Sequence, residues 1–177
     1  MGNLERIYPS QIQFKNRQKL FSQIWRRNIG RRRDDQKTVL IRACTDITGF
    51  GLAGHLLEMI RESKGVGIEL HSSSLPLFPR VEEFAKTGLI PPGSKRNRKF
   101  QEEKIPFSKD IPDWKRWIVF DAQTSGGLIL SAPAQETDTL LRRLHEEGVE
   151  EASVIGKVVE DPEGRITVTW SKTRRFP

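Results

Sequence analysis

The order of helix and strand signals along the chain predicts an α+β fold, an α/β sandwich in which a mixed β-sheet is covered by helices. Two observations support this prediction. Short apolar runs rich in strand formers alternate with segments of helical periodicity, and turns rich in glycine, proline and serine separate them. The chain of 177 residues is long enough to bury a core, and 36% of its residues are apolar.

Residues 1–37 predict a basic amphipathic helix followed by a polar linker. The helix is expected at residues 10–29 and ends near Gly30. This segment carries much of the formal net charge of +7. Such a cluster can bind a polyanion, form a solvated face or rim a site for a phosphate-rich small molecule. Direct nucleic-acid binding is not expected, because no known nucleic-acid motif accompanies the charge.

Residues 38–177 predict one domain, which begins with alternating strands and helices. The first strand is expected at residues 38–44 and to be largely buried. Its last residue, Cys44, is expected to be a buried structural cysteine. The next elements are expected at residues 52–63 (helix), 66–70 (strand) and 80–87 (helix).

The second half of this domain contains a segment without clear periodicity. Residues 91–113 begin with proline, glycine and basic residues, which predicts a long loop or a mobile flap. The later elements are expected at residues 117–120 (strand), 128–132 (strand), 133–147 (helix), 152–159 (strand) and 165–170 (strand). Turn chemistry at residues 161–164 is typical of a hairpin between the last two strands.

The junction between the first strand and the helix at residues 52–63 is the strongest candidate for a binding site. Gly49 and Gly51 permit positive φ angles and close backbone approach, and the first N–H groups of a helix favour an anion. Asp46 would repel a bare phosphate but suits a phosphate that arrives with Mg²⁺, which prefers oxygen ligands. The same pattern fits a capped helix behind a simple tight turn, so spacing alone does not decide between these readings.

The composition excludes several other classes of protein. The chain has one cysteine, so it forms no internal disulfide, and this fits a cytoplasmic protein. No apolar run approaches the ~20 residues of a membrane span, and the first residues lack a secretory signal. The three histidines show no metal-ligand spacing, and no Cys-x-x-Cys motif is present.

Four blocks of the chain, in order, carry a family resemblance. They are Thr-Asp-Ile-Thr-Gly-Phe-Gly-Leu-Ala-Gly-His-Leu at residues 45–56, Pro-Gly-Ser-Lys-Arg-Asn at 92–97, Asp-Ala-Gln-Thr-Ser-Gly-Gly-Leu at 121–128, and Ala-Ser-Val-Ile-Gly-Lys-Val at 152–158. Together they resemble the C-terminal half of selenophosphate synthetase (selenide, water dikinase), in the aminoimidazole ribonucleotide synthetase-like superfamily. Ala122 and Ser94 depart from the family pattern, which has proline and threonine there, and neither change removes a ligand.

The resemblance implies a fold like the C-terminal domain of aminoimidazole ribonucleotide synthetase and a share in an ATP-dependent reaction of selenide. In that family the other half carries the reactive cysteine or selenocysteine and its lysine, so no catalytic residue is expected here and this chain alone should be inactive. The resemblance assigns Asp46 to Mg²⁺. The residues that it implies for phosphate or nucleotide binding are Thr48, Gly49, Gly51, Lys95, Arg96, Asn97, Thr124, Ser125, Gly126 and Gly127.

Some alternatives stay open at this point. A bend before a strand explains the turn at residues 121–127 as well as a nucleotide site does, and His55 is expected to pack rather than to bind a ligand. The chain could also be the C-terminal domain of another ATP-dependent member of the superfamily, or a non-catalytic module that binds a polyanion or nucleic acid. The expected partners are an N-terminal ATP-binding half, ATP and selenide, with a homodimer as one option and no membrane.

Overall fold

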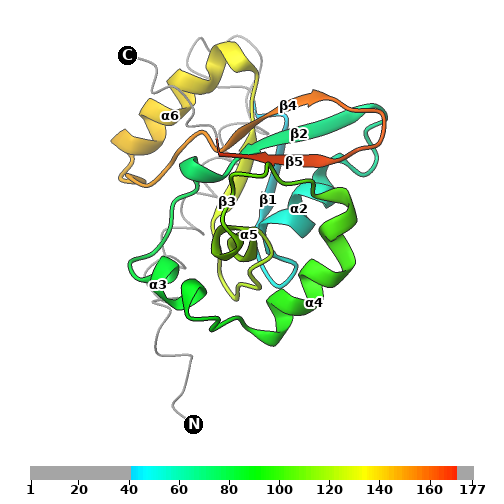
Figure 1. Cartoon of the computed structure of the whole chain (residues 1–177). Coiled ribbons are helices and arrows are strands. Elements are labelled where there is room, and N and C mark those ends of the chain that lie inside the picture. The colour runs from blue at the N-terminus through cyan, green and yellow to red at the C-terminus, as the bar shows by residue number, and fades with distance from the viewer. Residues whose placement is uncertain (1–40, 171–177) are drawn as a thin grey trace.

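The computed structural model describes residues 41–170, which form two sheets and several helices (Figure 1). The α-helices are α2 (Gly51–Ile60), α3 (Val81–Lys86), α4 (Pro92–Gln101), α5 (Asp113–Val119) and α6 (Thr137–Glu146). The strands are β1 (Ala43–Asp46), β2 (Val66–His71), β3 (Leu128–Ser131), β4 (Gly156–Glu160) and β5 (Ile166–Thr169). Short 3₁₀ turns are η2 (Ser72–Ser74), η3 (Glu102–Lys104) and η4 (Ala134–Glu136).

The predicted α+β class is confirmed, and most of the expected elements are present with shifted ends. α2, β2, α3, β3 and β5 occupy their expected places, η4 and α6 together replace the helix expected at 133–147, and β4 begins later than expected. The helix expected at 10–29, its linker and residues 38–40 lie outside the described residues, so the division of the chain at residue 37 stays a prediction. Within the described residues, no helix is both long and apolar enough to cross a membrane.

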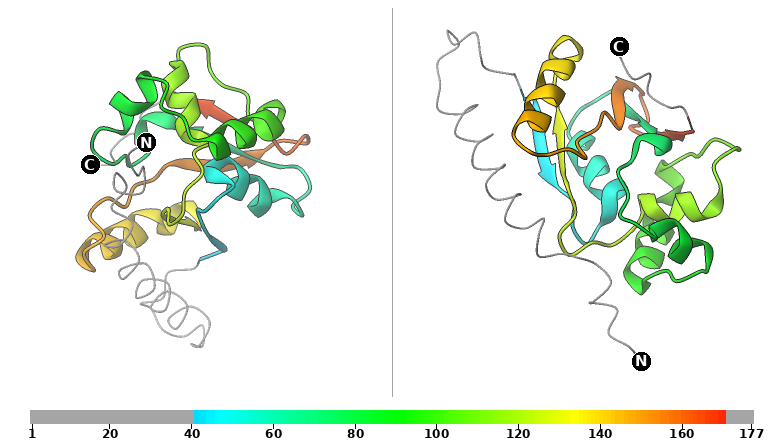
Figure 2. Two further views of the ribbon diagram at one scale, coloured as in Figure 1. Left: turned by 90° about the horizontal axis from the view of Figure 1, so that it is seen from below. Right: turned by 90° about the vertical axis from the view of Figure 1, so that its left-hand side faces the viewer.

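The predicted mixed sheet is present, and a two-stranded sheet accompanies it. In the mixed sheet β2 lies between β4, to which it is antiparallel, and β5, to which it is parallel. β1 pairs antiparallel with β3, so that Asp46, the last residue of β1, lies opposite Leu128, the first residue of β3. The strands of the two sheets run in different directions (Figures 1 and 2). The pairing of β1 with β3 brings the turns at 45–51 and 121–127 to one end of the smaller sheet.

The hairpin expected around residues 161–164 is wrong, although the turn itself forms. The N–H of Gly164 donates to the carbonyl of Asp161 at 3.1 Å, and Gly164 has a φ of 62°. The strands on either side do not pair with each other, because β2 lies between them. The turn crosses the start of β2, where Ile68 donates to the carbonyl of Arg165 at 3.0 Å. Local turn chemistry predicts the reversal of the chain but not which strand lies in the gap.

The long loop or flap expected at residues 91–113 is also wrong, because its first part is helix α4. Pro92 occupies the first turn of α4, where its missing N–H costs nothing. The residues that α4 buries are Ser94 and Asn97, spaced by three. Because the buried face is polar, the segment shows no apolar periodicity, which is the signal that predicts helices from sequence.

The strand expected at residues 117–120 is instead the end of helix α5. A short apolar run is compatible with either a strand or a buried helix segment. The helix starts after Pro112 and is supported by a hydrogen bond from Trp117 Nε1 to Asp113 Oδ2 at 3.0 Å, one turn apart. Val119 and Phe120 at its end are fully buried. This packing of the helix end decides between the two readings.

β1 is less buried than expected, and Cys44 is exposed. Along β1 the residues alternate between half-buried and exposed, so Cys44 and Asp46 share the exposed face. Partial burial of the thiol, and then the charge of Asp46, raise the pKa of Cys44. The expectation of a buried structural cysteine is therefore wrong, because within the described residues β1 is covered on one face only.

The core lies between α2, α5 and the three-stranded sheet. α2 contributes an apolar stripe at the helical spacing that the sequence shows, namely Leu52, Leu56 and Ile60 with Ala53 between them. The other buried members are Ile68, Leu70, Ile105, Ile111, Val119, Phe120, Ile129, Ile166 and Val168. Burying a side chain of this size contributes roughly 1.5–3 kcal/mol. The packing fixes α2, and with it the turn at residues 45–51 that leads into the helix.

Candidate functional site

The turns at residues 45–51 and 121–127 are joined by backbone hydrogen bonds. The N–H of Gly126 donates to the carbonyl of Ile47 at 2.9 Å, and the N–H of Ile47 donates to the carbonyl of Gly127 at 2.9 Å. The N–H of Gln123 donates to the carbonyl of Thr48 at 3.1 Å. Two motifs about 75 residues apart in the sequence therefore form one hydrogen-bonded unit at the end of the β1–β3 sheet.

The first turn closes directly onto α2. The N–H of Gly51 donates to the carbonyl of Thr48 at 3.0 Å, and Phe50 at the helix N-cap is 56% exposed. Within the described residues, the N–H groups of Gly49 and Phe50 have no protein acceptor. N–H groups of this kind at a helix start can bind an anion such as a phosphate.

The glycines of the two turns fall into two classes. Gly51 has a φ of +72°, and a Cβ on it would lie 2.8 Å from the backbone carbon of Phe120. A Cβ on Gly126 would lie 2.8 Å from the backbone oxygen of Ile47. At Gly49 and Gly127, by contrast, a Cβ would meet nothing within 4 Å, and neither residue has a positive φ. Each turn thus has one glycine that packing requires and one that faces open space.

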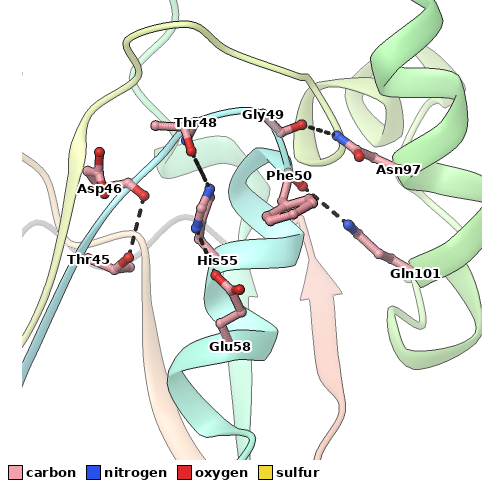
Figure 3. Close-up of polar contacts among 9 residues, drawn as sticks. All are labelled: Thr45, Asp46, Thr48, Gly49, Phe50, His55, Glu58, Asn97 and Gln101. Atoms are coloured by element: carbon pink, nitrogen blue, oxygen red, sulfur yellow. Dashed lines mark hydrogen bonds and ion pairs between the residues drawn. The ribbon is translucent and has the colours of Figure 1, made fainter.

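Helix α4 supports the first turn with its polar face (Figure 3). Asn97 is only 9% exposed, and its Nδ2 donates to the carbonyl of Gly49 at 2.8 Å and to that of Phe120 at 3.1 Å. Gln101 Nε2 donates to the carbonyl of Phe50 at 3.3 Å. Within the block at 92–97, Asn97 reaches the turn, and it does so by holding backbone carbonyls.

The remaining candidate residues lie at the surface around these turns. Lys95 and Arg96 are exposed on α4, Thr124 is exposed, and Ser125 is half-buried. Asp46 is exposed at the end of β1. The structure thus brings the residues of all three blocks to one end of the molecule, with Asn97, Gly51 and Gly126 inside and the others toward solvent.

A family model described as "AIR synthase related protein, C-terminal domain" matches residues 26–169 of this chain. The chain belongs to this family. The match includes both joined turns, α4 and both sheets.

Curated relatives of this AIR synthase related domain include proteins named "Selenide, water dikinase". The protein from Pelobacter propionicus is 42% identical over 128 residues, which are 72% of this chain and 36% of the relative. The protein from Caldanaerobacter subterraneus subsp. tengcongensis is 42% identical over 132 residues, 75% of this chain and 38% of the relative. The protein from Nitratidesulfovibrio vulgaris is 47% identical over 96 residues, 54% of this chain and 27% of the relative. The match to the first two thus spans little more than a third of each relative.

The AIR synthase related domain has a second carboxylate near the turns, which sequence reasoning missed. Asp121 Oδ1 accepts a hydrogen bond from Ser94 Oγ at 3.0 Å, and the same Oγ accepts one from the N–H of Ala122 at 3.0 Å. Burial raises the pKa of Asp121, and the hydrogen bond from Ser94 opposes that shift. Ser94 and Asn97 lie three residues apart on one face of α4, and this spacing of buried polar residues is the signal that could have indicated the contact.

His55 is a further residue that the site uses in a way the sequence did not show. The expectation that it packs agrees with its 6% exposure, but its ring also contacts Thr48 and Glu58 (Figure 3). Among the described residues, no three His, Cys, Asp or Glu side chains are grouped so that they could hold a metal ion. The first turn itself carries one acidic candidate for a metal ligand, Asp46.

Proposed function

We propose that this domain is the C-terminal part of a selenophosphate synthetase and forms one wall of its Mg²⁺–nucleotide site. The whole enzyme would convert selenide, ATP and water to selenophosphate, AMP and phosphate. The names of the curated relatives support this proposal, as do the family blocks at residues 45–56, 92–97 and 121–128.

The observation that carries the proposal is the pair of glycines that face open space on two joined turns. Packing explains Gly51 and Gly126, but nothing in the described protein requires Gly49 or Gly127 to be glycine. Glycine at such positions is explained by a group from outside that approaches the backbone closely. The unpartnered N–H of Gly49 points to an anionic group, which in a nucleotide is a phosphate.

The donor set at the end of β1 fits Mg²⁺. The Asp46 carboxylate is an exposed hard oxygen donor two residues before Thr48, and carboxylates of this kind hold Mg²⁺ together with substrate phosphates. A bound Mg²⁺ would neutralise charge on the phosphates. We propose that Asp46 is one ligand of several and that the remaining ligands come from the N-terminal half.

The other candidates divide by what they offer a nucleotide. Lys95 and Arg96 carry exposed positive charge, and Thr124 and Ser125 carry hydroxyl groups on the second turn. Asn97 acts on the nucleotide through Gly49, whose carbonyl it holds. We assign no catalytic residue to this chain, so it is expected to be inactive without an N-terminal half. We also propose that the whole enzyme is cytoplasmic, with a homodimer as one option.

The test combines this chain with an N-terminal half. The full chain is mixed with the N-terminal part of the Pelobacter propionicus relative, and ATP consumption is measured with Mg²⁺, with and without selenide. Activity that needs both polypeptides and selenide supports the proposal. ATP turnover independent of selenide would instead indicate another ATP-dependent member of the superfamily, and turnover by the chain alone would contradict its assigned role.

The metal role of Asp46 has a matched control in Asp138. Asp46→Asn keeps the shape of the side chain and removes its charge, so we expect a large loss of Mg²⁺-dependent activity. Asp138 is exposed in the first turn of α6. This helix follows the end of β3 that lies away from the turns (Figure 1), so Asp138→Asn should leave activity unchanged. Equal activity of the two variants would mean that Asp46 does not bind the metal.

A further inference from the structure

His55 contacts the first turn through a nitrogen that must accept a hydrogen bond. Its Nε2 lies 3.0 Å from the backbone nitrogen of Thr48 and 3.0 Å from Thr48 Oγ1 (Figure 3). A backbone N–H can only donate, so Nε2 carries no proton in this arrangement. The ring proton is then on Nδ1, from which it is donated to Glu58 Oε2 at 3.1 Å.

This contact holds the first turn on the side opposite to its hydrogen bonds with the second turn. The carbonyls of Ile47 and Thr48 are held by N–H groups of Gly126 and Gln123 in the second turn. The N–H of Thr48 points the other way and is held by His55. A rotation of the peptide between Ile47 and Thr48 would break two of these bonds together, the one to the Ile47 carbonyl and the one from the Thr48 N–H.

We propose that His55 is a positioning residue for the nucleotide site: Nε2 fixes the backbone at Thr48, and Glu58 fixes the proton on Nδ1. The proposal rests on the proposed function, because it is the turn between Asp46 and Gly49 that is held in place. Because Nε2 carries no proton, the Thr48 hydroxyl at 3.0 Å donates to it as well, so His55 fixes both the backbone and the side chain of Thr48. His55 itself touches no substrate.

Three variants of the full chain separate positioning from packing. His55→Phe keeps a ring of similar size and removes the accepting nitrogen. His55→Gln removes the ring but can place an amide oxygen where Nε2 lies. His71→Phe is the control, because His71 on β2 is 8% exposed, close to the 6% of His55, and is also paired with a carboxylate, Glu69, at 3.0 Å.

The affinity for Mg²⁺–ATP is followed by NMR titration of the full chain, with thermal unfolding to confirm that each variant is folded. We expect about tenfold weaker binding for His55→Phe, equivalent to a hydrogen bond lost at the site, and a restored affinity for His55→Gln. His71→Phe should bind as the natural chain does. Equal binding by His55→Phe and the natural chain would overturn the proposal.

A second measurement tests the positioning role without any ligand. The nitrogen-15 shifts of the His55 ring in the natural chain should show a neutral ring with the proton on Nδ1. A proton on Nε2 would overturn the proposal. Because this measurement uses the natural chain, it applies even if His55→Phe does not fold. If the natural chain binds no Mg²⁺–ATP even in the presence of the N-terminal half but the ring has the expected tautomer, the proposed function fails while the contact that holds the turn stands.

Discussion

Replacing Asn97 by alanine should destabilise the fold, because this one side chain holds two backbone carbonyls from different segments. Its Nδ2 donates to the carbonyl of Gly49 at 2.8 Å and to the carbonyl of Phe120 at 3.1 Å, and the second of these bonds is buried. An orphaned buried acceptor costs about 1–3 kcal/mol, and a hydrogen bond near the surface contributes about 0.5–1.5 kcal/mol. Alanine is the better helix former by about 0.5 kcal/mol, so the net loss should be about 2–3 kcal/mol.

Urea unfolding of the full chain measures this loss. With a slope of about 2 kcal/mol per molar urea, the midpoint of Asn97→Ala should fall by about 1–1.5 M. Lys99→Ala is the matched control, because Lys99 is exposed on the same helix and should shift stability by less than about 0.5 kcal/mol. Asn97→Asp should be worse than Asn97→Ala at neutral pH, since a carboxylate would face two carbonyl oxygens, and the gap should narrow in acid as the carboxyl gains a proton.

The result that would refute this reasoning is an Asn97→Ala variant as stable as Lys99→Ala. If that variant also lost affinity for Mg²⁺–ATP, Asn97 would act on the nucleotide directly, as the family resemblance implies. If it lost stability and affinity together, the side chain would act through the turn. Measuring both quantities on the same protein therefore distinguishes a ligand from a support.

Two further predictions concern the turns and the buried carboxylate. Gly51→Ala should lower the free energy of unfolding by about 2–5 kcal/mol, because φ is +72° and the new Cβ would lie 2.8 Å from the backbone of Phe120. Gly49→Ala, by contrast, should leave the unfolding midpoint unchanged and weaken Mg²⁺–ATP binding about tenfold. A Gly49→Ala variant that binds as the natural chain does would argue against a ligand at the open face. Asp121→Asn should gain stability relative to the natural chain as pH rises from acid to neutral, because burial raises the pKa of Asp121 and its ionised form is the costly one in the folded state. Unfolding measured across that pH range checks this, and a stability difference that does not depend on pH would contradict it.

The sequence was most informative where a buried face is apolar. The stripe of Leu52, Leu56 and Ile60 predicts α2 because its residues recur at helical spacing, and the structure buries the same residues. α4 buries Ser94 and Asn97 instead, and a polar buried face gives no such signal. The prediction of a loop at residues 91–113 was wrong for this reason. The support that α4 gives to the first turn could not be predicted from the sequence for the same reason.

The candidate site was predictable in composition but not in arrangement. The blocks at residues 45–56 and 121–128 indicate a shared site, and the hydrogen bonds of Ile47 with Gly126 and Gly127 show that the two turns meet. The contacts of His55 and Asp121 depend on a neighbour on another turn of helix or on another element. Ser94 lies 27 residues from Asp121, and Thr48, although only seven residues from His55, reaches it through the bend of the turn, so neither contact shows as a periodic pattern.

By itself the sequence determined the α+β class, the turn that leads from a strand into α2, and the family blocks on which the proposed nucleotide and Mg²⁺ site rests. Only the tertiary structure decided that Gly51 and Gly126 are required by packing while Gly49 and Gly127 face open space. It also decided that β2 lies between β4 and β5, so that the reversal at residues 161–164 makes no hairpin. The physical reason is the same in each case. Propensity and periodicity describe a residue and its near neighbours in the chain, whereas the room beside a glycine and the partner of a strand are set by segments that only folding brings close.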